Sequence, residues 1–213
     1  MQNVTLTPSF AEEIMFEAQG YRLIAGIDEV GCGALAGPLV AAAVILPSGL
    51  NAPWLSRVRD SKQLSASMRQ VLFQSIREVA VSVGIGTIPH HVIDARGLSK
   101  ARRLAMKMAM EKLSPSPDCL LIDHLRLPEV SLTQKGITNG DQLCFSIACA
   151  SIMAKVTRDQ MMVKLDRTYP GYGLARHKGY GTREHLVCLR CLGPCPIHRR
   201  SYQPVKDVIG REK

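Results

Sequence analysis

Two adjacent carboxylates, Asp28 and Glu29, lie between an apolar segment and a glycine-rich turn in the stretch GIDEVGCGALAGP, residues 26–38. Carboxylates at the end of a strand can hold Mg²⁺ or Mn²⁺, hard ions that prefer oxygen ligands and keep bound water. Such ions neutralise both the acids and an approaching phosphate, and one of their water molecules can become the attacking hydroxide. The pair therefore indicates metal-dependent phosphate chemistry, although a solvent-exposed Asp-Glu pair has the same local pattern.

The same stretch has a second interpretation, because Gly31, Gly33 and Ala36 have the spacing G-x-G-x-x-G/A of a dinucleotide-binding turn. That turn needs a helix that begins at once and receives the pyrophosphate. Here Pro38 and the following LVAAAVIL indicate another strand instead. The two acids would also place negative charge beside a negative ligand, so the context favours the metal site.

Two further acids could join the pair. Asp123 ends a second apolar segment, LLID, and parallel neighbouring strands would bring it close to Asp28. Asp159 follows Ser151 and Lys155 at i, i+4, i+8 spacing, which places the three side chains on one face of a helix. A Lys155–Asp159 surface ion pair, worth about 0.2–0.5 kcal/mol, would give the same spacing. Periodicity does not separate these alternatives.

The charge balance indicates a polyanionic partner. The chain has 27 Lys plus Arg against 18 Asp plus Glu, a formal net charge of +9. Between Arg176 and Arg200 there are six Lys or Arg, three of the six histidines and a single acid, Glu184. Nucleic acid is the leading candidate for the partner, and a solvated basic face without a ligand is the alternative.

Strands that alternate with helices must position these residues. Apolar patterning predicts strands over residues 21–29, 39–46, 80–88 and up to Asp123, and helices over 67–79, 90–113, about 143–168 and 183–192. This alternation indicates an α/β sheet. With 213 residues we expect one domain, with an N-terminal extension over about 1–19 and a C-terminal helical segment and tail over about 182–213.

The sequence contains no pattern of a membrane or secreted protein. The longest apolar run, residues 34–47, is too short to span a bilayer. Glu12, Glu13 and Glu17 interrupt the first twenty residues, where a signal peptide would have its apolar core. We therefore expect a cytoplasmic protein whose seven cysteines are reduced.

One cysteine cluster supports a non-enzymatic alternative. Cys188, Cys191, Cys195 and His198 have the spacing C-x₂-C-x₃-C-x₂-H, so they could form a zinc-bound nucleic-acid-binding module without catalytic activity. Cys188 and Cys191 fall on a predicted helix, however, and no second cysteine pair supplies the usual ribbon. Both features count against zinc.

Taken together, the motifs resemble the type 2 ribonuclease H family. The resemblance covers about residues 20–206 and rests on five stretches in the order and spacing of that family: GIDEVGCGALAGPLVAAAVILP, DSKQLS, LLID, SIACASIMAKVTRD, and YPGYGLARHKGYGTREH followed by GPCPIHRRSYQPV. It implies a ribonuclease H-like α/β fold, with a central mixed β-sheet flanked by helices and a helical C-terminal part.

The resemblance also implies an activity. Members of the family cut the RNA strand of RNA/DNA hybrids, and they cut on the 5′ side of ribonucleotides embedded in duplex DNA, leaving 3′-hydroxyl and 5′-phosphate ends. Four acids would organise two divalent ions, Mn²⁺ or Mg²⁺, and they match Asp28, Glu29, Asp123 and Asp159 here. The expected partners are therefore hybrid and ribonucleotide-containing duplexes, bound by a monomer.

Substrate contacts follow from the same resemblance. The turn Gly31-Cys32-Gly33 would let main-chain groups sense the 2′-hydroxyl, and Tyr180 would pack on the deoxyribose next to the ribonucleotide. Candidate phosphate contacts are Lys62, Lys155, Lys178, Arg199 and Arg200.

Two positions depart from the family pattern. Cys32 stands where the family usually has arginine, and His124 follows Asp123 where the family usually has glycine. Neither departure removes an acid, so both bear on substrate preference more than on catalysis.

Overall fold

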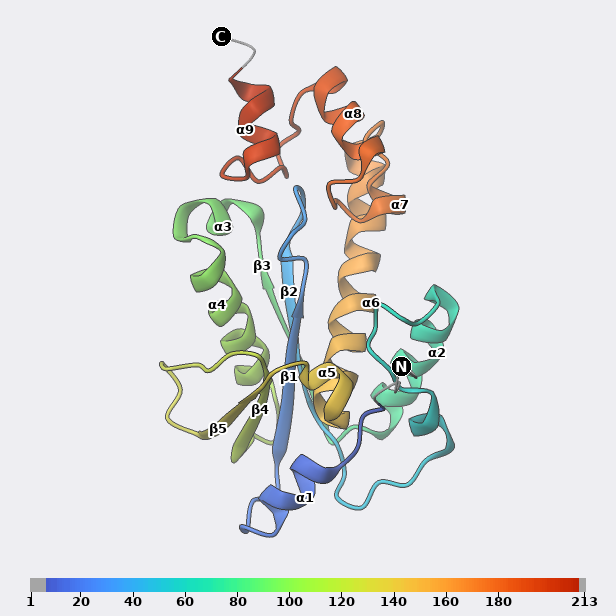
Figure 1. The fold of residues 1–213 in the computed structure, drawn as a ribbon, viewed down its shortest axis with the longest axis vertical. Helices are drawn as coiled ribbons and strands as arrows, with labels where there is room; N and C mark the ends of the chain where they lie inside the picture. The colour runs from blue at the N-terminus through green and yellow to red at the C-terminus, as the bar shows by residue number, and fades with distance from the viewer. Residues whose placement is uncertain (1–6, 211–213) are drawn as a thin grey trace, which may run out of the picture.

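The fold is a five-stranded mixed sheet with helices on both faces, seen in a computed structural model that describes residues 7–210 (Figure 1). The strand order is β3-β2-β1-β4-β5. The strands are β1 (Ile24–Val30), β2 (Leu39–Ile45), β3 (Ser82–Ile88), β4 (Cys119–Asp123) and β5 (Thr133–Ile137). Strand β1 pairs antiparallel with β2 and parallel with β4. This architecture confirms the predicted α/β fold class.

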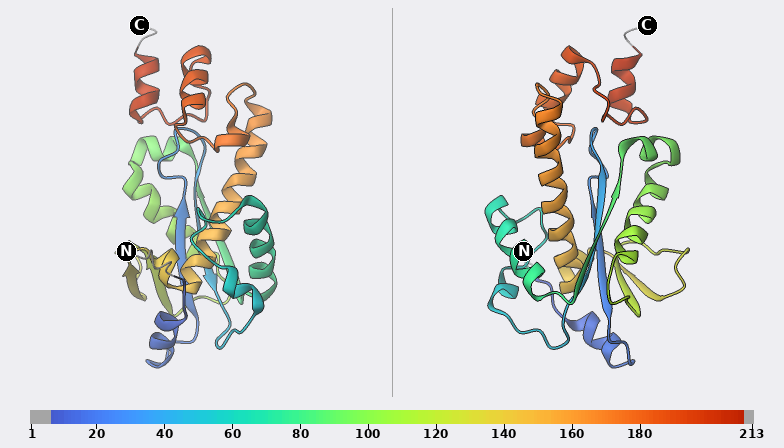
Figure 2. Two further views of the ribbon diagram at one scale, coloured as in Figure 1. Left: turned by 45° about the vertical axis from the view of Figure 1, so that its right-hand side comes forward. Right: turned by 180° about the vertical axis from the view of Figure 1, so that it is seen from behind.

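The sheet is buried on both faces because its central strands are largely apolar. All seven residues of β2 are buried, as the sequence LVAAAVI requires. On one face, α4 (Leu98–Glu111) packs with α3 (His90–Arg96), and on the other, α6 (Phe145–Thr168) packs with α2 (Ala66–Val79) (Figure 2). A Cβ atom added at Gly26 of β1 would lie 2.1 Å from the main chain of Ser146, so α6 begins in direct contact with this strand.

Helix α6 continues past the sheet and carries the C-terminal part at its far end (Figures 1 and 2). That part contains α7 (Leu174–His177), α8 (Arg183–Leu192) and α9 (Gln203–Ile209), which confirms the predicted helical C-terminus. The remaining helices are α1 (Ala11–Glu17), the 3₁₀ helix η1 (Pro53–Arg57) and α5 (Gly140–Leu143). Within residues 7–210, no helix combines the length and the apolar character that crossing a bilayer requires.

Several predicted boundaries were wrong. The helix predicted over 90–113 is two helices, because Gly97 has a φ of +78° and interrupts the turn between α3 and α4. The first and third strands begin at Ile24 and Ser82, later than predicted. Strand β5 was not predicted at all. The first six residues of the expected N-terminal extension and the last three of the expected tail lie outside the described part of the chain.

Candidate active site

Asp28 and Asp123 come together at the point where β1 and β4 run parallel. Ile27 pairs with Ile122, so each acid stands one residue past a paired position. Asp28 is 6% exposed, and its carboxylate accepts a hydrogen bond of 2.7 Å from the main-chain N–H of Glu29. Burial, followed by the charges of Glu29 and Asp123, raises the pKa of Asp28 well above its usual range. The expected proximity of the two strand-end acids is thus confirmed.

A third acid of this group, Asp141, was missed in the sequence. The main-chain N–H of Gly140 donates to Asp123 Oδ1 at 2.8 Å, which ties the start of α5 to the end of β4. Asp141 follows in the same helix and is 7% exposed. Burial, together with the charges of Asp60 and Asp123, raises the pKa of Asp141 to about 6. Asp141 therefore belongs to the same electrostatic cluster as Asp28 and Asp123.

Lys62 supplies positive charge to this cluster. Burial alone would lower the pKa of its ammonium group, but carboxylates raise the pKa above its ordinary value; these carboxylates are Asp60, Asp141, Asp28 and Asp123. Lys62 lines a cavity of about 390 Å³ together with Asp28, Glu29 and Tyr180. The predicted substrate contact at Lys62 therefore lies beside the acids.

Glu29 has one carboxylate oxygen held and one oxygen without a partner. Its Oε1 forms an ion pair of 2.6 Å with Arg102 of α4 and accepts a hydrogen bond of 3.4 Å from the Cys32 thiol. Its Oε2 is buried and has no hydrogen-bond partner among the described residues. A buried carboxylate oxygen without a donor is costly unless a cation approaches it. Arg102 was not anticipated as a residue of this site.

These oxygen donors fit a divalent metal. Asp28, Glu29, Asp123 and Asp141 offer hard oxygen ligands. Burial, followed by the charges of neighbouring carboxylates, raises the pKa values of Asp28 and Asp141, and a bound cation would offset both effects. Within the described range, no group of three acidic, histidine or cysteine side chains is arranged to hold a metal on its own, so water or phosphate oxygens would have to complete the coordination. An open arrangement suits Mg²⁺ and Mn²⁺, which keep several waters and accept phosphate oxygens as ligands.

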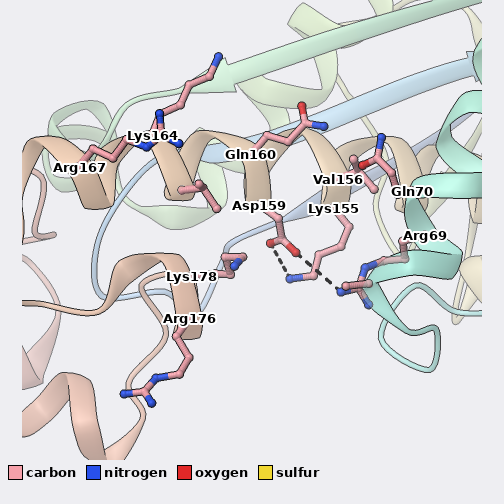
Figure 3. A pocket seen from close by; sticks show the side chains of 12 residues that line it. Arg69, Gln70, Lys155, Val156, Asp159, Gln160, Lys164, Arg167, Arg176 and Lys178 are labelled. Atoms are coloured by element: carbon pink, nitrogen blue, oxygen red, sulfur yellow. Dashed lines mark hydrogen bonds and ion pairs between the residues drawn. The ribbon is translucent and has the colours of Figure 1, made fainter.

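Asp159, by contrast, lies in a neighbouring groove. It receives a hydrogen bond of 2.8 Å from Lys155 Nζ, and Arg69 NH2 lies 3.8 Å from its other oxygen (Figure 3). It is not among the groups that shift the pKa of Asp28, Asp141 or Lys62. This placement favours the ion-pair interpretation of its spacing and leaves Asp159 outside the acidic cluster.

The groove around Asp159 is basic. It has a volume of about 610 Å³, and the charged side chains that line it are Arg69, Lys155, Asp159, Lys164, Arg167, Arg176 and Lys178 (Figure 3). Two of these residues, Arg69 and Lys155, also line the cavity that contains Asp28. The groove is therefore continuous with the acidic site and suited to phosphate groups.

The glycine turn and Tyr180 lie side by side at the edge of the site. Ala34 forms an antiparallel bridge with Tyr180, and the main-chain N–H of Leu35 donates to Gly179 O at 2.8 Å. The Tyr180 ring has Lys155 Nζ 5.9 Å and the Arg158 guanidinium 5.3 Å from its centroid. The turn and the tyrosine, both predicted to read the sugar, are therefore adjacent.

The structure contradicts the prediction that Arg199 contacts phosphate. Its side chain is fully buried, and its guanidinium donates to the carbonyl oxygens of Cys32 at 2.9 Å and Gly37 at 3.1 Å. Arg199 thus ties the glycine turn, at Cys32, to the segment that follows it, at Gly37, from inside the protein. Arg200 is exposed. Lys178 lines the basic groove, where its Nζ donates to the carbonyl oxygen of Ala175, so the predicted phosphate contacts at these two positions stay predictions.

Cys32 directs its thiol toward Glu29 rather than toward open solvent. Burial, followed by the charge of Glu29, raises the pKa of the thiol to about 12, so it stays protonated at neutral pH. The side chain also packs against the core next to Tyr202. The main chain of Cys32 therefore forms part of the turn, and its thiol donates a hydrogen bond to Glu29.

The zinc hypothesis was wrong. Cys191 is exposed whereas Cys195 is buried, and His198 uses one ring nitrogen for Cys195 and the other for His185. Across residues 7–210, no group of three histidine, cysteine or acidic side chains is arranged to hold a metal on its own. The four residues therefore do not form a zinc module.

Comparison with known proteins identifies the family of this chain. A model of the family described as Ribonuclease HII matches residues 25–205. A Ribonuclease HII of Dehalococcoides mccartyi is 53% identical over 209 residues, which cover 98% of this chain and 99% of that relative.

Solved structures show the same fold. Ribonuclease H2 from Pyrococcus horikoshii OT3 superimposes with a TM-score of 0.75 at 24% identity, covering 88% of this chain and 97% of that one. Bst-RNase HIII in complex with Mn²⁺ has a TM-score of 0.67 at 17% identity, covering 91% of this chain and 71% of that one. The family match, which spans most of the chain, and the relative that is 53% identical show the family: this chain belongs to the ribonuclease HII family of metal-dependent endonucleases.

Proposed function

We propose that this enzyme cuts on the 5′ side of single ribonucleotides embedded in duplex DNA as well as within the RNA strand of RNA/DNA hybrids, leaving 3′-hydroxyl and 5′-phosphate ends. The observation that carries the proposal is the group of Asp28, Asp123 and Asp141, of which Asp28 and Asp141 are buried; the unpartnered oxygen of Glu29 joins this group, and the glycine turn borders it. All of these residues come from one chain, so we propose that a monomer is sufficient.

Two divalent ions, Mn²⁺ or Mg²⁺, would supply an activated water for in-line attack and stabilise the leaving 3′-oxygen. Asp28 and Asp123 would hold the ions from adjacent strands. Glu29 would bind through its free Oε2, and Asp141 would bind from the start of α5. Arg102 keeps the other oxygen of Glu29 occupied, which fixes the direction of the free one. The ammonium group of Lys62 is placed to meet a phosphate oxygen at the same site.

Recognition would divide between the turn and the groove. Main-chain groups of Gly31–Gly33 can approach the minor groove and meet the 2′-hydroxyl, the group that distinguishes a ribonucleotide. The Tyr180 ring would pack on the adjacent deoxyribose. Lys155, Lys178 and the basic groove along α6 would bind backbone phosphates without reading sequence.

The direct test is cleavage of a labelled duplex that contains one embedded ribonucleotide, beside an all-DNA duplex of the same sequence, with and without a chelator. We expect a single cut on the 5′ side of the ribonucleotide that requires divalent metal. Cleavage of the all-DNA duplex, or cutting that continues in chelator, would contradict the proposal.

Tyr180→Ala should lower cleavage at a single embedded ribonucleotide by about tenfold more than it lowers cleavage of a long hybrid, because loss of one aromatic contact of about 1–3 kcal/mol matters most at a junction. The measurement is kcat/KM on both substrates. Tyr180→Phe is the matched control and should retain the preference, since the ring rather than the hydroxyl makes the contact. Equal losses on both substrates would give Tyr180 a structural or general binding role.

The two glycines of the turn should respond differently to alanine. Gly33 is exposed and an added Cβ meets nothing within 4 Å, so Gly33→Ala should change the free energy of unfolding by less than about 0.5 kcal/mol. Its methyl group would still stand between the turn and a sugar, so cleavage at a ribonucleotide should fall.

Gly31 has a φ of +94°, and a Cβ there would lie 2.3 Å from Arg158 Nε. Gly31→Ala should therefore destabilise the fold as well as impair cleavage. Thermal unfolding and cleavage assays on both variants make the comparison. Normal activity of Gly33→Ala would show that the turn does not approach the sugar closely at this position.

A further inference from the structure

Two histidines form a buried chain of contacts behind Tyr180. His185 Nε2 lies 3.1 Å from His198 Nε2, and His185 Nδ1 lies 3.0 Å from the carbonyl oxygen of Tyr180. At the other end, the main-chain N–H of Cys195 points to His198 Nδ1 at 3.0 Å. His185 and His198 are both fully buried. The chain therefore connects the segment after α8 with the residue at the edge of the active site.

The contacts fix the tautomer of each ring. The Tyr180 carbonyl can only accept, so His185 Nδ1 donates, and Nε2 of the neutral ring is left as an acceptor. His198 Nε2 must then donate to it, which leaves His198 Nδ1 to accept from the Cys195 N–H. Each of the three contacts has one donor and one acceptor, and all of them are satisfied by a single assignment.

The opposite tautomers would fail at both ends. If His198 Nδ1 carried the proton, it could donate to Cys195 O at 3.3 Å, but it would then oppose the Cys195 N–H at 3.0 Å. His185 would also have to present a lone pair to the Tyr180 carbonyl. A third buried imidazole, that of His177, also has one defined tautomer. Its Nδ1 accepts from the Gly179 N–H at 3.3 Å, and its Nε2 donates to Tyr172 O at 2.8 Å.

Both rings of the pair are neutral. Burial, together with the neighbouring His185, lowers the pKa of His198 to about 4, and burial lowers the pKa of His185 as well. A second proton on His185 would place two N–H groups opposite each other across the 3.1 Å contact, and a second proton on His198, at Nδ1, would oppose the Cys195 N–H at 3.0 Å. The uncharged state is therefore the one that the geometry requires.

The far end of the chain holds the main chain of Tyr180 in place. Its N–H donates to His177 O at 3.0 Å, and its carbonyl accepts from Thr182 N at 2.8 Å and from His185. The preceding residues Lys178 and Gly179 have φ values of 53° and 79°. A segment with two successive left-handed residues needs such restraints to keep one conformation.

We infer that His185 and His198 are positioning residues for Tyr180: the linked neutral imidazoles hold its carbonyl, and thereby set the place of its ring beside the acids. The inference rests on the proposed role of Tyr180 in reading the junction. It assigns no contact with substrate to either histidine. It predicts that breaking the chain reduces selectivity rather than metal-dependent cleavage in general.

The test compares His185→Leu, which removes the donor, with His185→Asn, whose amide nitrogen can occupy the place of Nδ1. The measurement is the ratio of kcat/KM on an embedded ribonucleotide to kcat/KM on a long hybrid. We expect His185→Leu to lower this ratio by about fivefold to tenfold, as loss of one buried hydrogen bond allows, and His185→Asn to restore most of it. Adding His185→Leu to Tyr180→Ala should lower the ratio no further. An unchanged ratio for His185→Leu, including equal losses on both substrates, would overturn the inference. So would a double variant in which the losses of His185→Leu and Tyr180→Ala multiply.

A second measurement does not depend on cleavage. Long-range ¹H–¹⁵N correlation spectra of the full chain at neutral pH should show His185 protonated on Nδ1 and His198 protonated on Nε2. Other tautomers would overturn the positioning role of the two histidines even if Tyr180→Ala confirms the proposed function. If His185→Leu does not fold, the tautomers alone test the inference. If the tautomers are as expected but Tyr180→Ala leaves the ratio unchanged, the proposed role of Tyr180 fails, and the positioning role fails with it.

Discussion

Asp28→Asn should lower metal-dependent cleavage on the order of a thousandfold or more while leaving the fold intact. The reason is that Asp28 is a buried carboxylate held beside Glu29 and Asp123, an arrangement that serves a cation rather than packing. Removing its charge takes away a candidate ligand and relieves repulsion at the same time. Kinetics on the ribonucleotide-containing duplex measure the first effect, and thermal unfolding measures the second.

The free energy of unfolding of the metal-free protein should fall as the pH rises from acidic to neutral. The pKa of Asp28 is higher in the folded chain than in the unfolded chain, so the folded state binds this proton more tightly. The associated stability is present below the unfolded pKa, about 4, and is lost as the pH rises through the folded value. Metal-free wild type should therefore lose more stability than Asp28→Asn between acidic and neutral pH. Asp141, with a pKa of about 6, adds to the same trend.

Divalent metal should reverse that loss in the wild type. At neutral pH, Mn²⁺ or Mg²⁺ should raise the Tm of the wild type, because a ligand that binds only the folded state stabilises it by RT ln(1 + [L]/Kd). The rise should be much smaller for Asp28→Asn. Asp207→Asn, an exposed change on α9, is the control and should behave as wild type. Cleavage by Asp28→Asn within about tenfold of wild type would remove this residue from the catalytic assignment.

The strand-end acids could be predicted from sequence because each ends a recognisable apolar run. Asp28 follows GI and Asp123 follows LLI, and parallel pairing of the two strands was the expectation that the structure confirmed. Asp141 could not be found in this way. It follows β5, whose sequence TQKGI has a single large apolar residue and lacks the apolar alternation of a half-buried strand, so the segment gave no reason to place its end beside β4.

The burial of charged residues could not be predicted from the sequence either. Arg199 stands in the basic sequence HRRSY and looks like a surface residue, yet its partners Cys32 and Gly37 come from the opposite end of the chain. Arg102 lies on α4 among other cations, and only the packing of α4 against the sheet brings it to Glu29. Periodicity gives the face on which a side chain lies, but it does not give the distant element that covers that face.

Asp141→Asn should cause a loss of cleavage comparable to that of Asp28→Asn, on the order of a hundredfold to a thousandfold, whereas Asp159→Asn should cost less than about tenfold. Asp141 is buried and coupled to Asp123 and Asp60, so its charge serves the acidic cluster. Asp159 is paired with Lys155 and Arg69 in the basic groove. The measurement is cleavage of the same duplex by the two matched Asp→Asn variants, together with the Mn²⁺-induced change in Tm.

The two variants should also differ in how they bind nucleic acid. Asp159→Asn releases Lys155 and Arg69 from their acidic partner, so metal-free binding to a duplex should tighten, and its log-log salt dependence should steepen by roughly 0.9 for each phosphate newly neutralised. Asp141→Asn should leave that slope unchanged, because its charge faces the cluster rather than the groove. If Asp159→Asn instead abolishes cleavage and the metal-induced rise in Tm while Asp141→Asn keeps both, the fourth acid is Asp159, as the family resemblance implied, and the ion pairs seen here must break when metal binds.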